Sequence, residues 1–83
     1  MTPTQLKALF FQQLLNIAPE VEPDEVDPEA DLREELDIDS MDFMMLTVAL
    51  GKQLGINIPE TDHHQLNNVN NFLLYLQKKV SAG

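Results

Sequence analysis

The segment Asp39-Ser40-Met41-Asp42 holds the residue types most suited to chemistry. Asp39 is expected to cap a helix, because its carboxylate would accept hydrogen bonds from the backbone N–H groups near Asp42. Ser40 would then lie exposed in the first helical turn. The N–H groups and the dipole of a helix N-terminus stabilise anions, so Ser40 is a suitable position for a phosphate ester. Serine is also an ordinary residue at a helix start, and the residue types alone leave an unmodified Ser40 open.

Catalysis by the chain's own side chains is disfavoured. The sequence has no cysteine, which excludes disulfides, thiolate metal sites and a cysteine nucleophile, so any thiol must come from a cofactor. Ser40 as an enzymatic nucleophile would need the strand-turn-helix setting and the glycines of a nucleophile elbow, which the surrounding sequence lacks. We therefore expect no catalytic residue.

Two patterns suggest metal binding, and neither has the spacing that coordination requires. His63 and His64 are adjacent, and adjacent residues point about 100° apart on a helix, so they would not share one ion. Exposed histidines without a ligand role are expected. An Asp-x-Asp pair that ends at Asp39 resembles the start of a calcium-binding EF-hand loop, but the glycine and glutamate positions of that loop hold Asp42 and Val48. No metal site is expected.

The length and the charge of the chain narrow the function further. Eighty-three residues suit a single domain over residues 1–83, and the net charge is −9, with eleven of the fourteen acids between residues 20 and 39. This charge would repel nucleic acid and attract partners with basic surfaces, although an acidic run is also typical of a solvated loop. The N-terminus lacks the pattern of a signal peptide, and no stretch approaches the ~20 apolar residues of a membrane span. We expect a cytoplasmic protein without membrane insertion.

The N-terminal part predicts one helix and a long loop. Thr2, Pro3 and Gln5 form a capping box with proline at the first helical position, and Pro19 ends the segment, which places a helix at about 3–17. Residues 18–39 contain three prolines and most of the acids, so they are expected to form a loop with one helical turn at 32–36. A loop this long in a small domain is usually functional. The expected apolar contacts of the helix are Leu6, Leu9, Phe10, Leu14 and Ile17, and those of the loop are Val21, Val26, Leu32, Leu36 and Ile38.

The next helix is predicted at about 40–54 and is apolar on more than one side, which a surface helix does not require. One apolar stripe is expected in the core and consists of Phe43, Leu46, Leu50 and Leu54. The second stripe, Met41, Met44, Met45 and Val48, needs a separate explanation.

The C-terminal part completes the predicted fold. Residues 56–59 read as an extended connector, and residues 60–66 as a short, weak helix. Asn67 or Asn68 is expected to cap a last helix with a buried stripe of Val69, Phe72, Leu73, Leu76 and Val80. The predicted fold is all-α, a four-helix bundle with a long loop between its first two helices and a short third helix.

The motif around Ser40 resembles that of a known family. Leu36-Asp37-Ile38-Asp39-Ser40-Met41-Asp42 is similar to the attachment motif of acyl carrier proteins, whose usual form is leucine-glycine-x-aspartate-serine-leucine. In that family the serine is esterified by 4′-phosphopantetheine. The similarity covers about residues 30–76, and it continues through Leu46, Ala49, Leu50, the connector 55–59 and Asn68-Val69-Asn70.

The resemblance implies an acyl-carrier-protein-like bundle and a role for each part of the site. Ser40 would carry 4′-phosphopantetheine taken from coenzyme A, and Asp39 would help a phosphopantetheinyl transferase to recognise the chain. The arm would hold acyl groups as thioesters for fatty acid, polyketide or related lipid biosynthesis, and the protein would be a monomeric carrier rather than an enzyme. Its partners would be that transferase and acyl-transfer or synthase enzymes with basic surfaces. The implied partner-binding residues are Met41, Asp42, Met44, Met45 and Val48, and the implied acyl-chain pocket consists of Phe43, Leu46 and Leu50. A plain core role for the methionines and Val48 stays open.

The sequence departs from the family pattern in several places. Asp37 occupies the usual glycine position, Met41 the usual leucine, and Met45, Gly51 and Lys52 stand where the helix after the serine commonly has acids. These departures suggest a dedicated pathway rather than the housekeeping fatty acid synthase. A peptidyl or D-alanyl carrier would share the serine and the fold, and an unmodified acidic interaction module is the alternative from another class.

Overall fold

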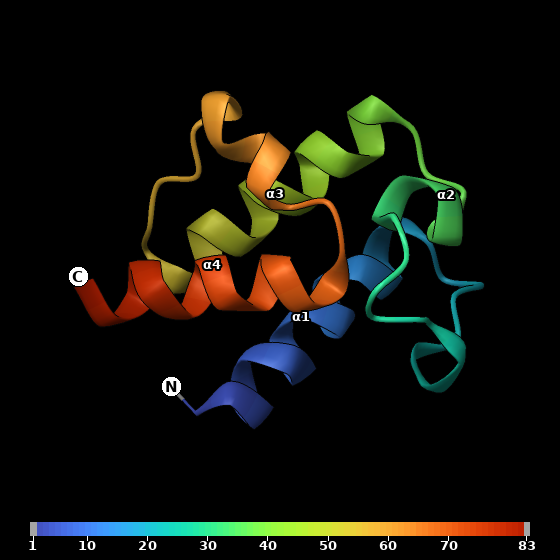
Figure 1. Ribbon diagram of the computed structural model, residues 1–83, viewed down its shortest axis with the longest axis horizontal. Helices are drawn as coiled ribbons and strands as arrows, with labels where there is room; N and C mark the ends of the chain where they lie inside the picture. Colours follow the sequence, from blue (N-terminus) through green and yellow to red (C-terminus); the bar gives the residue numbers. More distant parts are fainter. Residues whose placement is uncertain (1, 83) are drawn as a thin grey trace.

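The structure is a computed structural model that describes residues 2–82, and this part of the chain contains helices and loops but no strand. Four α-helices and two 3₁₀-helices follow one another in the order α1 Pro3–Ile17, η1 Pro23–Glu25, α2 Leu32–Leu36, α3 Ser40–Leu54, η2 Glu60–Gln65 and α4 Val69–Ala82. Figure 1 shows α4 crossing in front of α1. Helix α3 lies behind α4, and α2 lies at the right, next to the long loop. The predicted all-α fold is confirmed.

The helix ends follow from capping residues that the sequence displays. The Thr2 hydroxyl accepts a hydrogen bond from the Gln5 N–H (3.1 Å), and the Gln5 side chain accepts one from the Thr2 N–H (3.0 Å). This capping box satisfies two N–H groups that the helix leaves unpaired. At α4 the Asn71 N–H donates to the Asn68 side chain at 2.7 Å, so Asn68 is the capping residue. The predicted helices at 3–17 and 40–54 are confirmed at both ends.

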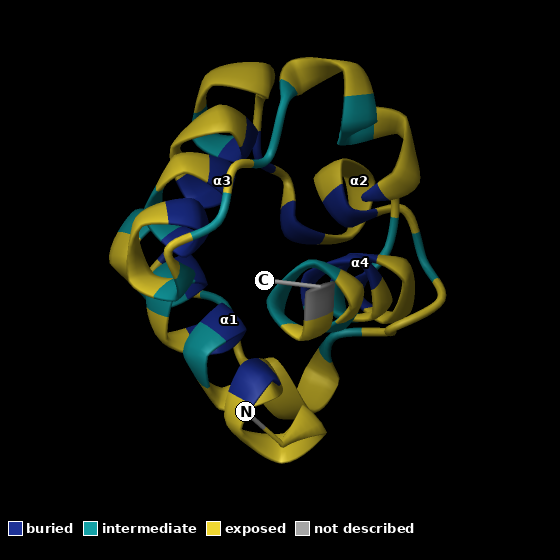
Figure 2. Ribbon diagram, turned by 90° about the vertical axis from the view of Figure 1, so that its left-hand side faces the viewer, coloured by how far each residue is buried: buried dark blue, intermediate teal, exposed yellow. Residues whose placement is uncertain are grey.

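The core lies where α1 meets α3 and α4. Figure 2 shows the buried sides of these helices and of α2 turned toward one another. The fully buried side chains include Phe10, Leu46, Leu50, Phe72 and Leu76, as predicted. Phe11 and Tyr75 are among the buried residues that were not predicted, which also include Ala18, Thr47 and Leu66.

Phe11 and Tyr75 are buried because the helix that carries each of them packs against more than one other element. Because α1 touches two helices, it buries a wider face than one helical stripe, which encloses Phe11 as well as Phe10. Tyr75 on α4 lies against η2, where its hydroxyl donates a hydrogen bond to Asp62 at 2.6 Å. Conversely, Leu9 and Ile17 of the predicted stripe are only partly buried.

The long loop is attached to the rest of the fold through backbone hydrogen bonds. The Leu32 N–H donates to the Asn67 carbonyl (2.8 Å), and the Asn70 N–H donates to the Pro28 carbonyl (3.2 Å). Leu36 and Ile38 are also buried, as expected of anchors. The acidic loop is thus pinned beside the start of α4, and it delivers the chain to α3 in a fixed position.

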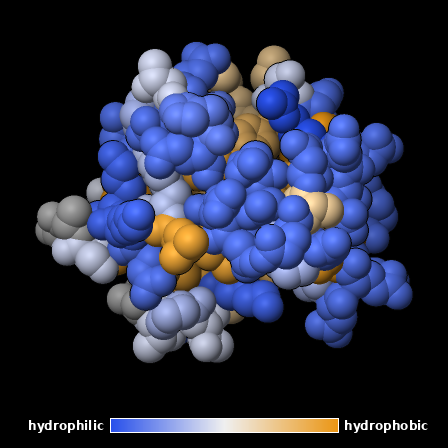
Figure 3. Space-filling model, in the orientation of Figure 1, coloured by the Kyte–Doolittle hydropathy of each residue, from blue (hydrophilic) through white to orange (hydrophobic). Residues whose placement is uncertain are grey.

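The surface is mostly hydrophilic on the side shown in Figure 3, with a small apolar area over α4. One large apolar side chain of α4, Leu74, is 55% exposed. Within residues 2–82, no helix combines the length and the apolar character that crossing a membrane demands.

Candidate functional site

Ser40 is the first residue of α3 and is exposed. Asp39 caps the helix as predicted, since its Oδ1 accepts a hydrogen bond from the Asp42 N–H at 2.8 Å. The N–H groups of the first helical turn have no intrahelical partner and point out of the helix end. Ser40 therefore presents its hydroxyl to solvent beside the positive end of a 15-residue helix dipole.

The turn before Asp39 explains how Ser40 is positioned. Asp37 ends α2 in the left-handed conformation (φ 53°, ψ 44°), and the Ile38 N–H donates to the Arg33 carbonyl at 3.2 Å. Ile38 is buried with 8% exposure and anchors the connection. Glycine, which the resembled attachment motif usually has at this position, adopts a positive φ without strain. Aspartate adopts this conformation more readily than most residues, so the turn still forms.

The Ser40 hydroxyl has no base beside it. Among residues 2–82, no histidine or carboxylate side chain forms a hydrogen bond with it. A serine that attacks a substrate on its own needs such a base within hydrogen-bond distance. Within residues 2–82, Ser40 is therefore an exposed hydroxyl without a hydrogen-bonded base.

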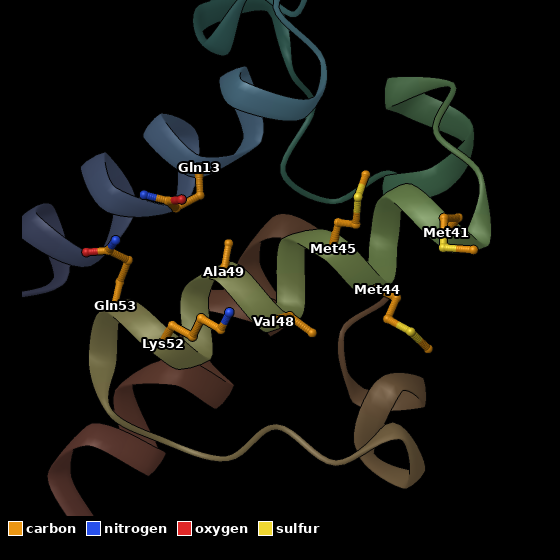
Figure 4. A pocket seen from close by; sticks show the side chains of 8 residues that line it. All are labelled: Gln13, Met41, Met44, Met45, Val48, Ala49, Lys52 and Gln53. Carbon is orange, nitrogen blue, oxygen red and sulfur yellow. The ribbon is translucent and has the colours of Figure 1, made fainter.

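The second apolar stripe of α3 lies on the surface. Met41 is 66% exposed, Met44 41%, Met45 47% and Val48 51%. These side chains and Ala49, with Gln13 of α1 on the opposite side, border a groove of about 430 Å³ that Lys52 and Gln53 close at its end. Figure 4 shows Met45 and Ala49 pointing toward α1, and Met44 and Val48 pointing to the other side of α3. The lining contains one charged residue, Lys52, and no acid.

The opposite stripe of α3 faces the interior. Phe43 is 5% exposed, and Leu46 and Leu50 are fully buried. The Phe43 ring is 6.0 Å from the Phe72 ring and 5.3 Å from the His63 ring, measured between centroids. On its outer side Phe43 lines a small cleft of about 80 Å³. Of the three residues implied as an acyl-chain pocket, Phe43 alone borders this cleft.

Arg33 is a site residue that the sequence reasoning missed. Its guanidinium carbon lies over the Phe43 ring, 5.5 Å from the ring centroid, and it borders the same cleft. The sequence could have drawn attention to it, because Arg33 is the one basic residue between Lys7 and Lys52 and lies within the acidic segment. Which ring it covers depends on the fold.

The two histidines occupy different environments. His63 is partly buried, contrary to the expectation of an exposed residue, because its ring in η2 packs on the Phe43 ring in the first turn of α3. His64 is exposed, and its Nδ1 is 2.9 Å from the Thr61 carbonyl, to which it donates as the Nδ1–H tautomer. Within residues 2–82, no group of three or more histidine and acidic side chains is arranged to hold a metal ion.

Comparison with known proteins identifies the family of this site. A family model described as a phosphopantetheine attachment site matches residues 5–76. The acyl carrier protein of Thermosynechococcus vestitus is 35% identical over 94% of this chain and 90% of its own length. The chain belongs to the acyl carrier protein family. The acyl carrier protein of Bdellovibrio bacteriovorus is 36% identical over 75% of this chain and 80% of its own. The meromycolate extension acyl carrier protein of Mycolicibacterium aurum is 36% identical over 70% of this chain and 60% of its own.

Membership of the acyl carrier protein family agrees with what the site offers. Proteins of this family are carriers that hold 4′-phosphopantetheine covalently and are acted on by synthase and transferase enzymes, and this chain is an acyl carrier rather than an enzyme. The resemblance inferred from the motif at Ser40 is confirmed. An exposed serine at a helix N-terminus, with no catalytic base beside it, is what such a carrier requires.

Proposed function

We propose that Ser40 is the attachment residue for 4′-phosphopantetheine and that this chain carries acyl groups for fatty acid, polyketide or related lipid synthesis. The observation that supports this most strongly is the position of Ser40, exposed at the N-terminus of α3, in a chain that matches the phosphopantetheine attachment family over residues 5–76. The phosphodiester of the arm would gain from the N–H groups of the first turn. Residues 1–83 would act as one carrier domain.

The chain offers a matched control for this assignment, because it contains two serines, Ser40 and Ser81, and both are exposed. The intact mass is measured before and after incubation with coenzyme A, magnesium and a broad-specificity phosphopantetheinyl transferase. We expect a gain of one phosphopantetheine group in the unchanged chain and in Ser81→Ala, and none in Ser40→Ala. No gain in a folded, unmodified sample would instead support the acidic interaction module.

We propose that Asp39 is read by the transferase in addition to capping α3. Two substitutions separate these roles. Asn caps a helix about as well as Asp, so Asp39→Asn keeps the helix start and removes the charge, whereas Asp39→Ala loses both. If the charge is read, the two variants will be modified at similarly reduced rates while their melting temperatures differ. Wild-type rates in Asp39→Asn would show that the cap is all that Asp39 supplies.

The groove beside the exposed stripe of α3 is proposed as the surface that partner enzymes contact, through Met41, Asp42, Met44, Met45 and Val48. Unbranched methionine side chains adapt to differently shaped partners, which suits a carrier that visits several enzymes. Val48 (51% exposed) and Leu74 (55% exposed, on α4) form a matched pair for the test. Val48→Asp is expected to raise the KM of the transferase for the carrier at least several-fold, and Leu74→Asp to leave it unchanged. Equal effects of both would remove the groove from the proposal.

The remaining parts of the proposal concern cargo, compartment and assembly. Leu46 and Leu50 are closed to solvent, so an acyl chain that reached them would have to displace core side chains. We propose that the chain is a monomer, because the acidic surface repels a second copy of itself. A cytoplasmic location is proposed separately and does not rest on this charge. Sedimentation of the purified chain tests the monomer, and a stable dimer at micromolar concentration would overturn it.

A further inference from the structure

A small cleft opens beside the N-terminal half of α3, on the side away from the groove. Its volume is about 80 Å³, and it lies between the start of α2, α3 and η2. Sites for drug-sized ligands are about 300–1,000 Å³, whereas a single water needs about 10–15 Å³ of such space, so this cleft accepts only a few heavy atoms. The lining residues that matter here are Asp31, Arg33, Phe43, His63 and His64.

The cation in this cleft has no anionic partner. Arg33 is exposed, and its guanidinium is placed over the Phe43 ring, 5.5 Å from the centroid. Within residues 2–82, no carboxylate forms an ion pair with it and no acceptor takes a hydrogen bond from its N–H groups, although the surrounding loop is rich in acids. Contact with an aromatic face leaves the N–H groups at the edge of the guanidinium available, and these match two oxygens of a carboxylate or a phosphate.

The acid that borders the cleft is already engaged. The Asp31 Oδ1 accepts hydrogen bonds from the Arg33 N–H (3.0 Å) and the Glu34 N–H (3.2 Å), so it caps α2. The other polar neighbours are His63, whose ring packs on Phe43, and His64. An anion in the cleft would therefore meet Arg33 and two imidazoles, and the one acid that lines the cleft, Asp31, accepts hydrogen bonds from helix N–H groups that offset its charge.

The position of the cleft relative to Ser40 gives it access to a tethered ligand. Phe43 follows Ser40 by three positions in α3, and residues so spaced lie on the same side of a helix. A group carried on Ser40 is held near the cleft at an effective concentration of about millimolar, since tethering replaces free diffusion. Tethering would thus favour occupancy of the cleft by an anion although the net charge of the chain is −9.

We propose that this cleft binds an anionic oxygen group of the arm or its cargo, with Arg33 as the ligand-binding cation and Phe43 as its support. The inference rests on the proposed attachment at Ser40. Two sources share this chemistry, the phosphodiester of the arm and a carboxylate at the far end of a short acyl group. The small volume fits a short, carboxylate-ended cargo and excludes a long alkyl chain while Phe43 stays in place.

The test compares four forms of the ¹⁵N-labelled protein: unmodified, phosphopantetheinylated, and loaded with a butyryl or a succinyl group. These two acyl groups have the same length and differ in the terminal carboxylate. Intact mass first establishes loading, and ¹H–¹⁵N spectra then report the Arg33 side-chain Nε–H and the amides of Phe43 and His63. We expect the succinyl form to shift these signals well beyond the butyryl form. If the arm's phosphodiester is the ligand, the shift instead appears on phosphopantetheinylation and does not grow with either cargo.

Two variants decide whether Arg33 is responsible. Arg33→Gln should abolish the shifts of Phe43 and His63, and Lys52→Gln, which removes the same charge from the groove on the other side of α3, should retain them. Both changes are at exposed positions, and unchanged melting temperatures would verify the fold. Loading without any shift of the cleft signals, or equal shifts in Arg33→Gln, would overturn this inference alone. Failure to load Ser40 would overturn the carrier assignment and this inference with it.

Discussion

Two neighbouring residues of α3, Met45 and Leu46, provide the sharpest test of which face of this helix is core and which is surface. Leu46 has no exposure, and Met45 is 47% exposed. A buried Leu→Ala change costs about 2–5 kcal/mol, because apolar contacts are lost and a cavity remains. An 83-residue domain has a free energy of unfolding of about 4–12 kcal/mol at 0.05–0.15 kcal/mol per residue. Leu46→Ala should therefore remove a large share of the stability.

The expected result is a wide separation of two melting temperatures. At about 4–8 °C per kcal/mol for a domain of this size, a loss of about 3 kcal/mol lowers the melting temperature of Leu46→Ala by about 12–24 °C. Met45→Ala should change stability by no more than about 0.5 kcal/mol, which is about 2–4 °C. Thermal unfolding followed by circular dichroism measures both.

Function should respond in the reverse order. Under the proposed docking role, Met45→Ala raises the KM of a partner enzyme and leaves kcat unchanged, because it removes binding that ground state and transition state share. Leu46→Ala, assayed below its melting temperature, should keep the KM. If Met45→Ala destabilises the fold as strongly as Leu46→Ala, the assignment of an exposed stripe is wrong; if it leaves the KM unchanged, Met45 has no docking role.

Three further predictions concern single positions. Asp37→Gly should raise the free energy of unfolding by about 0.5 kcal/mol, because the strain of the positive φ that glycine relieves is larger than the entropic cost of ordering a glycine. An unchanged denaturant midpoint would contradict this. Gly51→Ala should destabilise by about 1–3 kcal/mol despite the helix propensity of alanine, since its Cβ would lie 2.9 Å from the Ile56 carbonyl oxygen; a midpoint equal to or above wild type would refute the clash. Burial, with the Asp62 hydrogen bond, raises the pKa of Tyr75 to about 12. The folded state thus keeps this proton longer than the unfolded chain, so stability is full below the ordinary pKa of 10.0 and falls as the pH rises toward 12, a loss that Tyr75→Phe should reduce. As Tyr75 is the sole tyrosine, the absorbance of its phenolate follows the titration directly, and a midpoint near 10.0 would contradict the shift.

The helices of this fold were predictable because their start signals are local. Thr2, Gln5, Asp39 and Asn68 act within three residues of their own positions, and each capping bond appears in the structure. The apolar stripes were predictable for the same reason, since helical periodicity is a property of a short window. Ser40 could be singled out from the residues beside it.

Features that depend on contacts between distant segments could not be read in this way. Tyr75 is buried because η2 crosses α4, and its partner Asp62 is 13 residues away. Arg33 lies over Phe43 because the turn at Asp37 reverses the chain between them. In each case the residue types allow the contact, but only the packing of the helices selects it.

In this carrier, α3 presents an exposed apolar stripe on one side and borders the Arg33 cleft on another. Met44 and Phe43 are adjacent, and a rotation of about 100° per residue leaves Met44 exposed on the surface and Phe43 at the border of the cleft. Ser40 lies at the end of the helix, where a flexible arm attached to its hydroxyl has access to both sides. Under the two proposals above, a partner at the exposed stripe and an anion held at Arg33 would occupy different sides of α3. The departures from the family pattern fit this division. On the exposed side of α3, Met45 stands where the family pattern commonly has an acid, and most of the acids of this chain lie on the preceding loop, where Arg33 is the one basic residue.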